Sequence, residues 1–190
     1  DNDTLSFTTI SDTVSVITQI NNDSLYISLE PNWFGESIIT VTVSDGELED
    51  TGNFTLLVTP ENDVPNEFHL YYPENNVEVM MSQIPDDGLV FLWEGSEDID
   101  GDTLTYVFTL TDTLENIILT ENMDTTVIVI NDSSFIDIFH ELDVDTLFTY
   151  WFVDVGDGTE YTQSVEVFSL LLIDDTLMEI DDILHLPIEY

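Results

Sequence analysis

The sequence EDIDGDTLTY contains four carboxylates within six residues of one another. They belong to Glu97, Asp98, Asp100 and Asp102. Carboxylate oxygens suit Ca²⁺, which takes six to eight hard oxygen ligands in tolerant geometry and needs neither nitrogen nor sulfur. Gly101 permits a sharp turn among them. The loop is not an EF-hand, because its sixth and twelfth positions are Thr103 and Thr109 rather than Gly and Glu. The alternative is a hydrated acidic turn between two strands.

The chain has almost nothing to neutralise these carboxylates. Its 190 residues include 41 Asp plus Glu and no Lys or Arg, giving a formal net charge of −41. The side chains that can become cationic are His69, His140 and His185. We therefore expect no intramolecular salt bridges. Self-repulsion must be relieved by solvent and salt, by raised carboxylate pKa values or by bound cations.

The same composition excludes several classes of function. Without Lys and Arg there is no Schiff-base lysine, no arginine clamp for phosphate and no basic face for nucleic acid. Without Cys there is no thiolate catalysis, disulfide or Cys-based zinc site. The chain lacks a Gly-x-Ser-x-Gly elbow, and nothing marks one pair of its many carboxylates as catalytic. The longest apolar run, at 167–173, is too short to span a membrane. We expect neither an enzyme nor a membrane-inserted protein.

Period-two alternation of apolar residues predicts an all-β protein. We expect strands over residues 4–9, 14–20, 24–29, 38–43, 54–58, 68–72, 89–93, 103–110, 116–120, 125–130, 148–155 and 164–173. Asp45-Gly46 and Asp157-Gly158 are typical of hairpin turns. Helical periodicity is nearly missing. The strand spacing favours β-sandwiches.

The stretch TPENDVPN interrupts the alternation with two prolines, as interdomain linkers do. We predict an immunoglobulin-like sandwich over 1–60, a linker over 61–66, a second sandwich over 67–173 and an acidic tail or linker over 174–190, with a short helix near 177–184. Five strands leave the first sandwich about two strands short. Either Asp1 lies inside a domain whose beginning is missing, or a strand from another chain completes the sheet.

Residues 31–66 resemble the second half of a bacterial cadherin-like or immunoglobulin-like tandem repeat of large surface and secreted proteins. The resemblance lies in a Pro-Asn-Trp-x-Gly turn from Pro31, an Ile-Thr-Val-Thr-Val strand, a Ser-Asp-Gly turn and a junction of the form Pro-x-Asn-Asp-x-Pro. It covers about a third of the chain. In the family the repeat begins some 30 residues earlier, and that acidic lead-in is absent before DTLSF.

This resemblance implies calcium at the junction, since such repeats bind Ca²⁺ through an Asn-Asp pair. Here the pair is Asn62 and Asp63, joined by Glu61 and by Asp98 or Asp100. The ion would make the linker rigid. Not all bacterial repeats with this junction bind metal. Asp1 and Asp3 are candidates for the remains of a third acidic site.

The second domain resembles fibronectin type III sandwiches more loosely. The resemblance implies core positions for Trp93, Tyr106, Leu142, Tyr150 and Trp151. The last residues, LPIEY, are similar to the segment before the C-terminal sorting domain of type IX secretion substrates. The two likenesses together imply an extracellular or cell-surface protein.

Exposed aromatic residues give a third kind of candidate site. Trp33 with Phe34, and Tyr71 with Tyr72, could form a platform for sugar, since the apolar faces of sugar rings stack on aromatic rings. The alternative is that these rings fill the core.

The sequence thus favours a structural or adhesive module, a calcium-stiffened spacer joined to neighbouring domains of the same polypeptide. One alternative is a filament or lattice subunit that self-associates by strand donation. Another is a carbohydrate-binding accessory module of a secreted enzyme.

Overall fold

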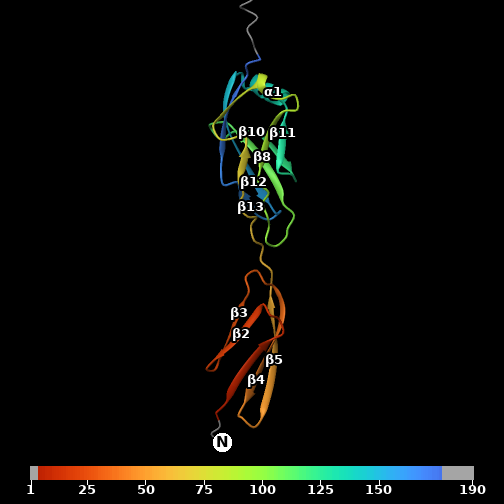
Figure 1. Ribbon diagram of the computed structural model, residues 1–190, viewed down its shortest axis with the longest axis vertical. Coiled ribbons are helices and arrows are strands. Elements are labelled where there is room, and N and C mark those ends of the chain that lie inside the picture. Colours follow the sequence, from red (N-terminus) through yellow and green to blue (C-terminus); the bar gives the residue numbers. More distant parts are fainter. Residues whose placement is uncertain (1–3, 177–190) are drawn as a thin grey trace, which may run out of the picture. The chain divides into compact units, whose positions relative to one another are not determined.

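The computed structural model describes residues 4–176 and divides into two compact units, residues 1–62 and 63–190 (Figure 1). Strands make up most of the regular structure in both. The predicted all-β, sandwich-like fold is confirmed.

From residue 4 onward, unit 1 contains five antiparallel strands, β1 (Ser6–Ser11), β2 (Val16–Asn21), β3 (Ser24–Leu29), β4 (Gly35–Ser44) and β5 (Glu49–Val58). They form a sheet with the order β1-β4-β5 and a β2–β3 hairpin. The turn between β4 and β5 is the predicted Asp-Gly turn. Asp45 Oδ1 accepts hydrogen bonds from the N–H groups of Glu47 and Leu48, and Gly46 takes a φ of 98° that favours glycine.

The inner face of the unit 1 sheet is only partly covered. Alternate residues of β4 point to this face, where Ile39 is fully buried. Its register partner Phe54 keeps 43% of its surface exposed. Farther along the face, Val43 is half-buried and its partner Phe7 is 40% exposed. These side chains line an open groove of about 370 Å³. Val16 and Ile39 are the apolar residues buried in the described part of unit 1, so it has a small core.

The described part of unit 2, up to residue 176, has nine strands, β6 (Leu70–Tyr72), β7 (Val77–Met80), β8 (Leu89–Trp93), β9 (Thr105–Thr111), β10 (Ile117–Met123), β11 (Val127–Ile130), β12 (Thr146–Gly156), β13 (Tyr161–Gln163) and β14 (Phe168–Ile173). The larger sheet has the order β10-β9-β12-β14-β7, with β13 also paired to β12. The smaller has the order β11-β8-β6. Neighbours are antiparallel except β7 and β14, which are parallel.

An aromatic core fills unit 2. On β12, Trp151, Val153 and Val155 are fully buried, as alternation along a strand requires. The Phe91 ring packs edge-to-face on Trp151 and on Phe108, with ring centroids 5.2 and 4.8 Å apart. The predicted core positions of Trp93, Tyr106 and Trp151 are confirmed, because each keeps 5% or less of its surface exposed.

Two predicted core residues lie outside this core. Tyr150 is 37% exposed, because its neighbour Trp151 points inward and alternation turns Tyr150 to the opposite face. Leu142 is 46% exposed. It ends helix α1 (Asp132–Leu142), beside the left-handed C-cap residue Asp143.

Helix α1 is the main departure from the strand-only prediction. It buries Phe135 and Phe139, which lie one turn apart on one face. Asp132 in the first turn and His140 in the last complement the helix dipole. A single 3₁₀ turn, η1 (Met81–Gln83), follows β7.

Strand boundaries differ from the prediction at β5, which begins five residues before the predicted 54–58, and near β13 and β14. The predicted strand over 164–173 begins too early, since residues 164–167 connect β13 to β14 without strand pairing. There the Val165 N–H donates to the Phe68 carbonyl over 3.0 Å. β7 and β13 were not predicted. The helix expected near 177–184 lies outside the described residues. Within residues 4–176, no helix is long and apolar enough to cross a membrane.

Candidate metal centre

The acidic loop is the segment Glu97–Asp102, in the connection between β8 and β9 of unit 2. β8 ends at Trp93 and β9 begins at Thr105, and both strands carry buried aromatic side chains. The loop is also anchored to the core directly, because the Ser96 N–H donates to the buried Tyr106 hydroxyl over 2.9 Å. The base of the loop is therefore held by two strands with buried side chains, one from each sheet of unit 2.

Asp98 organises the turn. Its Oδ1 accepts hydrogen bonds from the backbone N–H groups of Asp100 and Asp102, at 2.8 and 3.3 Å. Its carbonyl accepts from the Gly101 N–H over 3.2 Å. Gly101 has a φ of 80°, which L side chains rarely adopt. Asp98 and Gly101 together fold the chain back so that alternate carboxylates share one side.

Three carboxylates consequently meet. Asp98, Asp100 and Asp102 each offer an oxygen, and these oxygens lie within 4.8 Å of one another. Asp98 is half-buried, whereas Asp100 and Asp102 are exposed. The second oxygen of Asp98, Oδ2, is buried and has no hydrogen-bond partner among the described residues. A buried carboxylate oxygen without a donor is costly, so this atom calls for a cation or another donor.

The donor set fits Ca²⁺. Two oxygens that each lie 2.3–2.6 Å from one ion can be at most about 5 Å apart, and the spacing within 4.8 Å meets that limit. Three carboxylates are fewer than the six to eight oxygens that Ca²⁺ takes. Backbone carbonyls or water would supply the remainder, and Ca²⁺ accepts such ligands readily.

The loop is also bonded to the start of unit 2. The Asp63 N–H donates to Asp100 Oδ2 over 2.7 Å. The Asn66 N–H donates to the Glu97 carbonyl over 2.9 Å, and the Ser96 hydroxyl donates to the Asn66 carbonyl over 2.6 Å. The first residues of unit 2 and the acidic loop thus form one bonded structure.

The remaining predicted ligands fall outside the group of three. Glu97 is exposed, and its carboxylate is not part of that group. Asp63 reaches the loop through its backbone N–H. Asn62 is the last residue of unit 1. Asp1 and Asp3 lie outside the described residues.

The predicted sugar-binding aromatics lie at separate places. In unit 1, Trp33 is half-buried, with its ring packed near Gly35, where an added Cβ would lie 3.7 Å from the indole. In unit 2, Tyr71 and Tyr72 on β6 are 52% and 49% exposed. The Trp33 ring is thus partly packed within its own unit, whereas Tyr71 and Tyr72 keep about half of their surface exposed.

One ion pair overturns the expectation that the chain has none. His69 Nδ1 lies 2.7 Å from Glu166 Oε1, although 97 residues separate them in sequence. The hydrogen bond and charge of Glu166 raise the pKa of His69 above 6.5. Burial raises the pKa of Glu166, but the hydrogen bonds from His69 and from the Leu70 N–H outweigh it, so this pKa is lowered.

The likeness of this chain to known proteins is limited to solved structures at low TM-scores. No protein-family model matches the chain, and no curated protein sequence matches it. Among solved structures, an endo-fucoidan hydrolase from glycoside hydrolase family 107 shares 17% identity at a TM-score of 0.29, over 91% of this chain and 24% of that one. A substituted form of the same hydrolase has the same identity and coverage and a TM-score of 0.30. Chicken VE-cadherin EC1-2 shares 14% identity at a TM-score of 0.32, over 92% of this chain and 85% of that one. The chain therefore spans about a quarter of the length of the hydrolase chains.

Proposed function

We propose that the chain is a structural or adhesive segment of an extracellular protein, and that unit 2 binds Ca²⁺ at the acidic loop. The observation that carries this proposal is the buried Oδ2 of Asp98, which has no hydrogen-bond partner among the described residues. It belongs to a group of three carboxylates in a chain without Lys or Arg.

Electrostatics supports a cation at this place. Each carboxylate raises the free energy of its two ionised neighbours, and no lysine or arginine can offset that repulsion. A divalent cation bound between the three carboxylates would relieve this repulsion. Asp98, Asp100 and Asp102 would hold the ion. When bound, the ion would supply positive charge and a fixed coordination geometry.

The proposed role of the ion is mechanical. Because Asp63 and Asn66 are bonded to the acidic loop, fixing the loop also fixes the chain where it enters unit 2. A spacer or adhesive module needs this resistance to local unfolding. Open, partly exposed sites in extracellular modules have dissociation constants of about 10⁻⁴–10⁻³ M, and we expect this range.

Calorimetric titration with Ca²⁺ tests the proposal. We expect saturable binding that Asp98→Asn weakens by at least about tenfold, equivalent to about 1.4 kcal/mol. Asp124→Asn is the matched control, because it removes the same charge from an exposed position outside the group. Equal effects of the two substitutions would mean that calcium only screens net charge, and the proposed site would be wrong.

Strand donation is a second candidate, favoured by the open groove of unit 1. Phe7, Val43 and Phe54 line that groove at the uncovered end of the inner face. An apolar strand from another molecule could cover them, as in β-strand addition. Sedimentation of the chain at rising concentration tests this candidate. Self-association that Phe54→Asp abolishes would support it, and a monomer at all concentrations would contradict it.

A further inference from the structure

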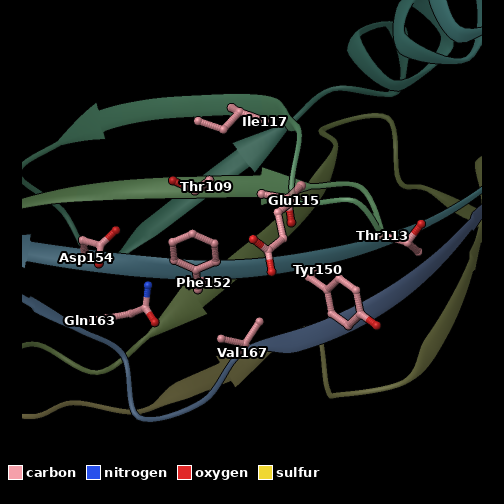
Figure 2. Close-up of a pocket in the computed structure, with 10 residues that line it drawn as sticks. Thr109, Thr113, Glu115, Ile117, Tyr150, Phe152, Asp154, Gln163 and Val167 are labelled. Atoms are coloured by element: carbon pink, nitrogen blue, oxygen red, sulfur yellow. The ribbon is translucent and has the colours of Figure 1, made fainter.

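The outer face of the larger sheet in unit 2 contains a hollow of about 730 Å³. Small-molecule sites in proteins typically measure about 300–1,000 Å³. The hollow is lined by residues of β9, β10, β12 and β13 and of the adjoining loops (Figure 2). Its lining residues include none of the acidic loop, and they do not include Trp33, Tyr71 or Tyr72.

Strand register explains why the sheet is hollowed here. Phe152 pairs with Thr109, and Tyr150 with Thr111, so each aromatic residue of β12 lies beside a small residue of β9. Both threonines are buried, with 6% and 7% of their surface exposed. On the other side of β12, the connection 164–167 leaves a gap between β13 and β14. The small threonines of β9 thus leave a low area beside the larger side chains of β12.

The lining combines aromatic and hydrogen-bonding groups. In Figure 2 the Phe152 ring lies at the centre, with Asp154 and Gln163 on one side and Glu115 on the other. Asp154 and Gln163 are register partners, so their side chains are neighbours on this face. Burial raises the pKa of Asp154, and a hydrogen bond from Gln163 opposes that shift.

A turn fixes the position of Glu115. Asp112 Oδ1 accepts hydrogen bonds from the N–H groups of Leu114 and Asn116, at 2.7 and 2.9 Å. Glu115 between them has a φ of 65°, a left-handed conformation that non-glycine residues rarely adopt. Such strain is maintained only where the surrounding structure imposes it, and it concentrates at ligand sites. The β9–β10 loop therefore fixes the backbone of Glu115 at the edge of the hollow.

We propose that this hollow binds a neutral saccharide, with one sugar ring stacked on Phe152 and its hydroxyls bonded to Asp154, Gln163 and Glu115. A sugar ring offers an apolar C–H face and a rim of hydroxyl groups, which match a central aromatic ring with polar groups on both sides. Carboxylates accept strong hydrogen bonds from hydroxyl donors, and the Gln163 amide can both donate and accept.

Charge narrows the ligand class. Glu115 and Asp154 would repel sulfate and carboxylate groups, and no lysine or arginine is present to bind them. A second copy of the chain would bring another formal charge of −41. A cationic ligand is the competing class. The two carboxylates flank the Phe152 ring rather than converging on one point (Figure 2), which suits a ring of hydroxyls better than a single ammonium.

Nitrogen-15 NMR of the whole chain in saturating Ca²⁺ tests the proposal. The probes are neutral oligosaccharides of glucose, galactose, mannose, xylose and fucose, added one at a time to millimolar concentration. We expect at least one to shift the backbone amides of Thr109, Phe152 and Gln163 saturably. Binding should change little between about 0.1 and 1 M NaCl, over which the Debye length falls from about 10 to about 3 Å.

Substitutions locate the contact. Phe152→Leu keeps an apolar side chain but removes the flat ring, and we expect binding about two- to tenfold weaker. Gln163→Ala, at an exposed residue, should also weaken binding without unfolding the chain. Tyr71→Ala is the control, because it removes an exposed aromatic ring of the other sheet of unit 2, and it should leave binding unchanged.

Two results would overturn the proposal. One is that no sugar of the panel shifts the amides of the hollow. The other is that spermidine binds there more tightly than any sugar and is released by salt, which would identify a cation site. Since the proposal does not rest on calcium binding, the Asp98→Asn chain should still bind the sugar wherever it remains folded.

Discussion

The backbone N–H of Asp63 donates a 2.7 Å hydrogen bond to Oδ2 of Asp100. This bond joins the first residue of unit 2 to the acidic loop, across 37 residues of sequence. A carboxylate that accepts a backbone hydrogen bond forms a stronger bond than a neutral acceptor does. The loop thus holds the chain at the boundary of unit 2, and any ion bound by the loop acts on that boundary.

Removing the Asp100 carboxylate should loosen the start of unit 2. We expect Asp100→Ala to speed hydrogen exchange of the Asp63 amide by about five- to tenfold, since the net value of such a bond is about 1–1.5 kcal/mol. Asp102→Ala is the control, because the Asp102 side chain belongs to the same acidic group but is not the acceptor for Asp63. Equal exchange rates in the two variants would contradict the role of Asp100.

Within the loop, Glu97 and Asp98 should differ in their effect on calcium binding. Asp98 belongs to the three-carboxylate group and Glu97 does not. We expect Glu97→Gln to change the calcium dissociation constant by less than about twofold, while Asp98→Asn weakens binding at least about tenfold, or about 1.4 kcal/mol. Calcium titrations of the two variants make the comparison. A large loss in Glu97→Gln would place Glu97 among the ligands.

The His69–Glu166 pair gives a pH dependence with a defined sign. The raised pKa of His69 means that its contribution to stability is complete below its ordinary pKa of 6.5 and is lost as pH rises through the raised value. The lowered pKa of Glu166 means that its contribution is complete above its ordinary pKa of 4.5 and is lost as pH falls through the lowered value. The pair should stabilise unit 2 most between pH 4.5 and 6.5.

Glu166→Gln should therefore lower the pKa of His69. Proton NMR titration of the histidine ring signals measures this shift directly. Asp124→Asn, which removes one charge from an exposed position, is the control and should leave the pKa of His69 unchanged. An unchanged pKa for His69 would contradict the ion pair.

Substitutions at two neighbouring residues of β12 should lower the free energy of unfolding by very different amounts. Trp151 is fully buried, so Trp151→Ala should lower the free energy of unfolding of unit 2 by about 3–5 kcal/mol. Tyr150 points to the opposite face and is 37% exposed, so Tyr150→Ala should cost about 1 kcal/mol or less. Urea unfolding followed by tryptophan fluorescence separates the two, with Trp93 as the remaining core probe in Trp151→Ala. Similar losses would contradict the alternation of β12.

Unit 1 should open more readily than unit 2. Its described residues bury few apolar side chains, Val16 and Ile39, whereas unit 2 buries a large aromatic cluster. Local stability follows buried apolar contacts. We expect the amides of β4 and β5 to exchange at least about tenfold faster than those of β9 and β12. Equal protection in the isolated chain would mean that the open groove does not weaken unit 1.

Much of the strand pattern was readable from the sequence, because alternation reports directly which side of a strand is buried. The predicted strands over 24–29 and 89–93 coincide with β3 and β8. Helix α1 was missed, although Phe135, Ile138, Phe139 and Leu142 follow the helical spacing of three and four residues. Its length of 11 residues is short, and Ile and Phe are also typical of strands.

The candidate sites also include one feature that the sequence predicts and others that it does not. Asp98, Asp100 and Asp102 are close in sequence, so a local turn suffices to bring their carboxylates together. The His69–Glu166 pair and the hollow around Phe152 depend on register between distant segments. A single sequence does not specify that register, so neither feature could be found before the structure was known.

Thermal unfolding in EDTA and across a calcium titration, at fixed ionic strength with magnesium as the comparison, tests whether the acidic loop binds calcium in the folded protein. A ligand that binds only the folded state raises stability by about 2.7 kcal/mol at 100 times its dissociation constant. We predict that calcium raises the Tm of the chain and that magnesium raises it less. Asp98→Asn should remove the rise that calcium produces. Equal rises with both ions, or no rise, would mean that Asp98, Asp100 and Asp102 form a solvated acidic turn.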